Sequence, residues 1–159
     1  MTINNCSKLE SISGMKLQQG QSISWIHQGS SRIEEILLHH CDGLTGVLYF
    51  PPSLKRLDIA DCDGLTSLES CSPELQSLKF LQLWDCKTPE SLPDVPQAYS
   101  SLQYLSIRRC PGLKTLPASL QQRLGSIHDK YVDAHLYGNK PRPMPMLLKP
   151  KTWKYVCKG

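Results

Sequence analysis

The run His39-His40-Cys41-Asp42 is the place in the sequence where residues able to do chemistry stand closest together. Imidazole, thiolate and carboxylate groups are the usual ligands of zinc, and a cysteine beside a histidine is also the pairing of a cysteine hydrolase. A structural zinc site needs a second pair of ligands, and the sequence contains neither CxxC nor HxxxH to provide it. We therefore predict no metal site here.

Cys41 is also not unique, as a catalytic nucleophile would be. It belongs to a series with Cys62, Cys86 and Cys110, at intervals of 21, 24 and 24 residues. The phosphate-binding patterns GxxxxGK[ST] and GxGxxG are absent from the sequence. We therefore predict that the chain is not an enzyme and that it has no catalytic residues and no cofactor.

Each cysteine in the series closes the same apolar pattern. In one copy Leu102, Leu105 and Ile107 precede Cys110, and Leu113 follows it. The other full copies use Ile33, Ile36, Leu38, Cys41 and Leu44; Leu54, Leu57, Ile59, Cys62 and Leu65; and Leu78, Leu81, Leu83 and Cys86. The intervals fall inside the period of leucine-rich repeats, about 20–29 residues. The pattern predicts a repeat solenoid.

The pattern also predicts how each repeat folds. In LxL the two apolar residues point to one side of a short strand, and stacked repeats bury that side together. We predict an α/β-type solenoid: a leucine-rich-repeat arc with a short parallel sheet on its concave face and little helix. The convex side should be irregular, extended or 3-10 backbone, because prolines interrupt it at residues 51–52 and 93. Pro89, in place of the expected leucine, should make one return irregular, and each cysteine should turn inward and donate a weak S–H bond to a carbonyl.

Three segments follow along the chain. Residues 1–117 carry the repeats, the first of them partial and followed by an insert at 13–30. Residues 118–136 form a C-terminal capping segment, for which we predict a short helix with Ser119 as its N-cap. Residues 137–159 are a proline-rich basic tail with six Lys or Arg and no Asp or Glu. We predict that the tail is solvated and partly caps the last repeat, or that it contacts an acidic or phosphate-bearing partner.

The outward residues of the predicted strands make the candidate binding surface. They are Glu35, Leu37 and His39; Arg56, Asp58 and Ala60; Phe80, Gln82 and Trp84; and Tyr104, Ser106 and Arg108. We expect Trp84 to lie near Tyr104 and Arg108, which would join apolar area to a charge as at a binding hot spot. The opposing interpretation, that Phe80 and Trp84 pack within the protein, has equal weight from the sequence.

The setting of the chain is also an expectation. It has no apolar run long enough to span a bilayer, no secretory signal pattern, and an odd number of cysteines, seven, of which the repeat explains four. We therefore expect a cytoplasmic protein with reduced cysteines. Because the first repeat lacks most of its strand, we also expect a fragment or a truncated product.

Short motifs at the ends of the repeats resemble a known family. These are Cys-Asp-Gly-Leu at 41–44 and 62–65, Cys-Pro-Gly-Leu at 110–113, Leu-Pro at 92–93 and 116–117, and the closing segments 116–124 and 146–155. They resemble the C-terminal leucine-rich repeats of plant, cereal-like nucleotide-binding disease-resistance proteins. The resemblance implies the recognition part of an intracellular immune receptor, without the coiled coil and the P-loop.

The implied partner is a protein: a pathogen effector, a guarded host protein, or the receptor's own nucleotide-binding domain. Nucleic acid is not an expected partner. Two alternatives stay open, namely an interaction module of another kind, such as the substrate receptor of a ubiquitin ligase, and a truncated receptor fragment without independent activity.

Overall fold

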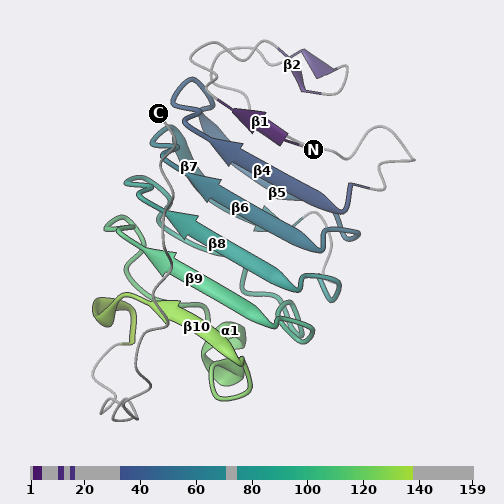
Figure 1. Ribbon diagram of the computed structural model, residues 1–159, viewed down its shortest axis with the longest axis vertical. Helices are drawn as coiled ribbons and strands as arrows, with labels where there is room; N and C mark the ends of the chain where they lie inside the picture. Colours follow the sequence, from purple (N-terminus) through teal and green to yellow (C-terminus); the bar gives the residue numbers. More distant parts are fainter. Residues whose placement is uncertain (1, 5–10, 13–14, 17–32, 71–74, 138–159) are drawn as a thin grey trace, which may run out of the picture.

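The centre of the molecule is a six-stranded parallel sheet (Figure 1). The computed structural model describes residues 2–4, 11–12, 15–16, 33–70 and 75–137. Across the sheet the strands run β1 (Thr2–Asn4), β4 (Glu35–His39), β6 (Arg56–Ala60), β8 (Phe80–Trp84), β9 (Tyr104–Arg108) and β10 (Asp129–Val132). From β4 to β9 each repeat adds one strand beside that of the preceding repeat. The predicted solenoid with a parallel sheet and little helix is confirmed.

The apolar pattern forms the core as predicted. The strands pair in register, so Ile36, Leu57, Leu81 and Leu105 make one column of side chains. A second column two residues along contains Leu38, Ile59, Leu83 and Ile107. All eight side chains are buried, at 1 % exposure or less. Each repeat therefore buries its apolar side against its neighbours, as the spacing requires.

The return side of the first two full repeats is a second sheet. β5 (Gly46–Phe50) pairs in parallel with β7 (Leu65–Ser70), and both strands lie behind the main sheet (Figure 1). Leu48, Phe50, Leu65 and Leu68 of these strands belong to the core. The prediction of an irregular or 3-10 convex side is wrong for these two repeats, because alternating apolar residues let adjacent returns pair as strands. The extended alternative is confirmed.

The later return is irregular, as Pro89 predicts. Residues 86–95 contain neither helix nor strand, and Pro89 itself is buried. The insert 13–30 lies almost wholly outside the described residues. At its start, β3 (Met15–Lys16) pairs antiparallel with β2 (Ser11–Ile12). Among the described residues, no helix has the length and apolar character needed to cross a membrane.

The repeat cysteines close the turn after each strand. Cys41, Cys62, Cys86 and Cys110 are fully buried, and none of these four is in a disulfide. The Cys62 thiol donates to the carbonyls of Ala60, at 3.2 Å, and of Leu38 in the preceding repeat, at 3.5 Å. Burial raises the pKa of the Cys62 thiol to about 12. The predicted structural role, an inward thiol donating to a carbonyl, is confirmed.

The residue before each of these cysteines has a left-handed backbone. φ is 55° at His40, 50° at Asp61, 54° at Asp85 and 56° at Arg109. This conformation turns the chain sharply out of the strand while its N–H still extends the sheet ladder. For example, the Asp61 N–H donates to the Trp84 carbonyl at 3.0 Å. The sequence pattern did not indicate it, because Asp and His tolerate this region but Arg has no special preference for it.

The Cys-Asp-Gly-Leu motif ties one turn to the next. The Asp63 N–H donates to Asp42 Oδ1 at 3.4 Å, and the Lys87 N–H donates to Asp63 Oδ1 at 3.0 Å. The hydrogen bonds of the Lys87 side chain and backbone hold the pKa of Asp63 below its usual value. This series ends at the next repeat, where Lys87 has no side-chain acceptor and Pro111 has no N–H to donate. Proline therefore replaces aspartate in the repeat whose preceding turn carries Lys87, because an N–H at position 111 would find no side-chain acceptor there.

The last part of the described chain closes one end of the sheet. It contains α1 (Ala118–Arg123), β10 and the 3-10 helix η1 (Ala134–Tyr137). The short helix is confirmed, but Ser119 is not its N-cap. Asp94 from the preceding repeat caps it, accepting from the N–H groups of Ala118 at 3.3 Å and Ser119 at 3.0 Å. The Ser119 hydroxyl also donates to Asp94.

Strand β10 was not predicted, because no apolar frame precedes it. Its residues are mostly exposed, with only Val132 partly buried, and it pairs in parallel with β9. Directly after it, Asp133 Oδ2 accepts the Arg109 N–H at 2.6 Å. At the earlier turns, the N–H of the residue before the cysteine donates to a main-chain carbonyl of the next repeat. At Arg109 the Asp133 carboxylate replaces that carbonyl.

Candidate functional site

The twelve predicted surface residues lie on one face of the main sheet, here called the ladder face. Strand register arranges them in three rows across β4, β6, β8 and β9. The first row is Glu35, Arg56, Phe80 and Tyr104; the second is Leu37, Asp58, Gln82 and Ser106; the third is His39, Ala60, Trp84 and Arg108. The predicted alternation of inward and outward residues is confirmed.

A guanidinium and three rings form a continuous series of contacts that starts in the first row and ends on β10. The Arg56 guanidinium lies 3.8 Å from the centroid of the Phe80 ring, and Phe80 stacks on Tyr104 at 4.3 Å with an interplanar angle of 3°. Tyr104 then meets Tyr131 of β10 at 6.1 Å, tilted by 50°. We call these four residues the aromatic row. These contacts hold the four side chains against one another.

The second row is less exposed than its outward direction predicts. Asp58 and Ser106 are only 5 % and 6 % exposed, so they belong to the buried residues. Neighbouring strands are about 4.8 Å apart, so longer side chains lean over shorter ones. Asp58 retains partners for its charge: it accepts from Gln82 Nε2 at 3.0 Å and Arg56 Nη2 at 3.2 Å. His39 Nε2 lies 3.4 Å from Asp58 Oδ1. The middle of the ladder face is therefore polar around Asp58, whose neighbours hold its carboxylate in place.

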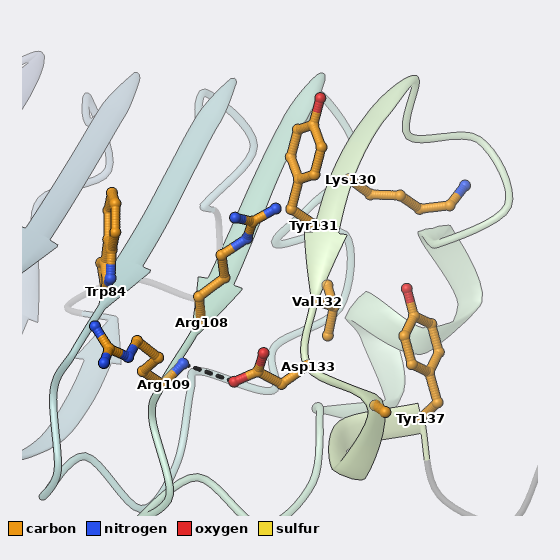
Figure 2. A pocket seen from close by; sticks show the side chains of 9 residues that line it. Trp84, Arg108, Arg109, Lys130, Tyr131, Val132, Asp133 and Tyr137 are labelled. Carbon is orange, nitrogen blue, oxygen red and sulfur yellow. Dashed lines mark hydrogen bonds between the residues drawn. The ribbon is translucent and has the colours of Figure 1, made fainter. Parts of the chain in front are cut away.

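The third row opens into a hollow at the carboxyl ends of the strands. The hollow has a volume of about 520 Å³. It is lined by Trp84, Arg108, Arg109, Lys130, Tyr131, Val132, Asp133, Ala134 and Tyr137 (Figure 2). Trp84 is opposite Arg108 in register, whereas Tyr104 is opposite Phe80 at the other end of the strands. The prediction that Trp84 lies near Arg108 is confirmed, and the prediction that it lies near Tyr104 is wrong.

Tyr131 is the main residue of the candidate site that the sequence pattern missed. It is 46 % exposed and Trp84 is 40 % exposed, and these two are the exposed large hydrophobic residues of the described chain. Both line the same hollow. A possible signal was the short polar-apolar stretch of residues 129–132 beyond the last repeat, but without the repeat frame its register could not be assigned.

The cations around the hollow differ in their partners. Arg109 Nη1 pairs with Asp85 Oδ2 at 3.2 Å. Lys130 Nζ donates to the carbonyls of Leu124 and Ile127 at 2.9 and 3.3 Å, so it is directed away from the hollow. The Arg108 guanidinium lies 4.9 Å from the centroid of the Tyr131 ring.

The other chemical candidates of the sequence point in different directions. His39 faces Asp58, His40 Nδ1 lies 3.3 Å from Asp61 Oδ2, and the Cys41 thiol turns into the core. Within the described ranges, no cluster of three or more His, Cys, Asp or Glu is arranged to hold a metal ion. The basic tail from residue 138 onward lies outside the described residues, so its predicted contacts stay predictions.

Comparison with known proteins adds no relative: no family model, curated protein or solved structure matches this chain.

Proposed function

We propose that the ladder face is a protein-recognition surface. On the resemblance of its repeat endings, we further propose that the chain is the leucine-rich-repeat module of an intracellular plant immune receptor, sensing an effector or a guarded host protein. The observation that supports recognition is the coincidence of the aromatic row and the hollow on one sheet face.

The composition of this face favours a protein partner. Tyr, Trp and Arg are the residues enriched at binding hot spots, where they bury large area at little conformational cost. In the part of the chain that the structure describes, Trp84 and Tyr131 are the large hydrophobic residues that are exposed. Short strands hydrogen-bonded on both sides hold β6, β8 and β9 rigid, so few degrees of freedom are lost on binding.

The aromatic row has two roles in this proposal. Phe80 and Tyr104 stack on each other, so part of their area is used within the protein. This contact differs from the packing of Phe80 with Trp84 that the opposing interpretation proposed. Trp84 makes no ring contact of this kind among the described residues. Trp84 is therefore the residue whose removal separates binding from stability.

The test uses a photo-crosslinking amino acid at matched tyrosines. Tyr104 lies on the ladder face and Tyr49 on the second sheet, and both are partly buried. Each is replaced in turn by benzoylphenylalanine, the protein is expressed in cereal leaf cells, and crosslinked proteins are identified by mass spectrometry. We expect proteins captured from position 104 that are missing from position 49.

The captured protein is then purified and its affinity measured. Trp84→Ala should weaken binding by about 2 kcal/mol, roughly thirtyfold, with the unfolding temperature unchanged. Capture of the same proteins from both positions contradicts the proposal. So does a Trp84→Ala protein that binds normally and unfolds at a lower temperature, because Trp84 would then be a packing residue.

A further inference from the structure

The hollow beside Arg108 carries an inference about what the partner presents. Three of its lining residues are cations, and two of them are already engaged. Arg109 is paired with Asp85, and Lys130 donates to two carbonyls outside the hollow. Among the described residues, the remaining cation, Arg108, is in no ion pair with a carboxylate, and its guanidinium lies 4.9 Å from the centroid of the Tyr131 ring. The hollow therefore offers one unpaired positive charge.

Two exposed aromatic side chains flank this charge in the hollow, whose lining also includes charged residues. Trp84 stands on one side of Arg108 and Tyr131 on the other, and Val132 follows Tyr131 on β10 (Figure 2). A volume of about 520 Å³ lies within the size range of small ligand pockets, about 300–1,000 Å³. It has room for two neighbouring side chains of a peptide.

We propose that this hollow binds an acidic side chain of the partner protein, with its carboxylate on Arg108 and an adjacent apolar side chain between Trp84 and Tyr131. The proposal rests on the proposed recognition function and specifies one contact within it. A guanidinium matches a carboxylate with two parallel hydrogen bonds, and such charge-assisted bonds are stronger than those between neutral groups.

A carboxylate fits the hollow better than a phosphate does. Phosphate groups carry close to two negative charges and are usually held by several cations. Here the charges of Asp85 and Asp133 lie beside the same hollow and oppose a second negative charge. The three cations of the hollow, Arg108, Arg109 and Lys130, and the two carboxylates leave a net charge of +1, which suits a single negative charge.

The test measures direct binding of three labelled peptides by fluorescence anisotropy. The first is acetyl-Gly-Ser-Gly-Leu-Glu-Phe-Gly-Ser-Gly-amide; the second has Gln and the third phosphoserine in place of Glu. We expect the Glu peptide to bind about tenfold more tightly than the Gln peptide, which corresponds to 1.4 kcal/mol. Arg108→Gln should abolish this difference and leave the affinity for the Gln peptide unchanged.

Lys114→Gln is the matched control, since it removes the same charge from an exposed lysine outside the hollow. It should leave the Glu preference intact, and both variants should unfold at the temperature of the native protein. Equal binding of the Glu and Gln peptides, binding of neither, or tighter binding of the phosphoserine peptide overturns the proposal. If crosslinking from position 104 still captures a partner in that case, the recognition function stands and only the assignment of the hollow fails.

Discussion

Replacing Gly64 by alanine tests the close stacking of one repeat on the next. A Cβ at Gly64 would lie 2.9 Å from the Asp42 carbonyl oxygen and would overlap the Leu44 carbonyl oxygen, both in the preceding repeat. These are backbone atoms, so the two turns must separate. The separation would weaken the Gly46 N–H bond to the Gly64 carbonyl, now 3.1 Å, and the Asp63 N–H bond to Asp42.

The expected cost follows from these contacts. Each of the two hydrogen bonds contributes about 1 kcal/mol, so we predict a loss of about 2 kcal/mol in the free energy of unfolding. This value lies within the range of about 1–3 kcal/mol that is typical of overpacking. Gly125→Ala is the control, because a Cβ there meets nothing within 4 Å. Urea unfolding followed by circular dichroism measures both variants. Equal midpoints for Gly64→Ala and Gly125→Ala would refute the stacking argument.

Three further predictions concern the core, the thiols and the acidic residues. Leu105→Ala should cost about 2–5 kcal/mol in urea unfolding, whereas Lys79→Ala at an exposed position just before β8 should stay within about 0.5 kcal/mol; equal losses would contradict the burial of Leu105 in the core. Cys62, Cys86 and Cys110 should react slowly with a thiol reagent in the native protein and Cys157 rapidly, and rapid reaction of all four would contradict the repeat register. Hydrogen bonds from Ser119 and Ala118 lower the pKa of Asp94, and those of Lys87 lower that of Asp63. Their stabilising contribution is therefore complete above the unfolded pKa, about 4, and is lost as the pH falls through the lower folded values. Asp94→Asn should lose less stability than the native protein between pH 5 and pH 2, and parallel pH curves would rule out this role for Asp94.

The solenoid could be predicted because every repeat carries apolar residues at the same positions and has to bury them against its neighbours. Leu57 and Ile59 must be buried, a single repeat cannot bury them, and the regular spacing places the same residues in register one repeat later. That register also predicted the outward direction of Phe80, Trp84 and Tyr104. For the same reason the cysteine turn was predictable, since a small inward side chain recurs at one position.

The features that escaped prediction depend on contacts between repeats or lie outside the pattern. Nothing within residues 118–124 identifies Asp94 as the helix cap, because it comes from the preceding repeat. Burial of Asp58 and Ser106 depends on the lengths of side chains in adjacent strands. Strand β10 has no leucine frame, so Tyr131, and with it the hollow, had no assigned register.

The most direct test of the recognition surface is hydroxyl-radical footprinting of the protein with and without the partner captured from position 104. Oxidation of a side chain reports its access to solvent, and Trp84, Tyr131 and Tyr49 are all reactive aromatic residues. We predict that the partner strongly slows the oxidation of Trp84 and Tyr131 on the ladder face and leaves Tyr49 on the second sheet unchanged. Unchanged oxidation of Trp84 and Tyr131 in the saturated complex would contradict the assignment of the ladder face as the binding surface.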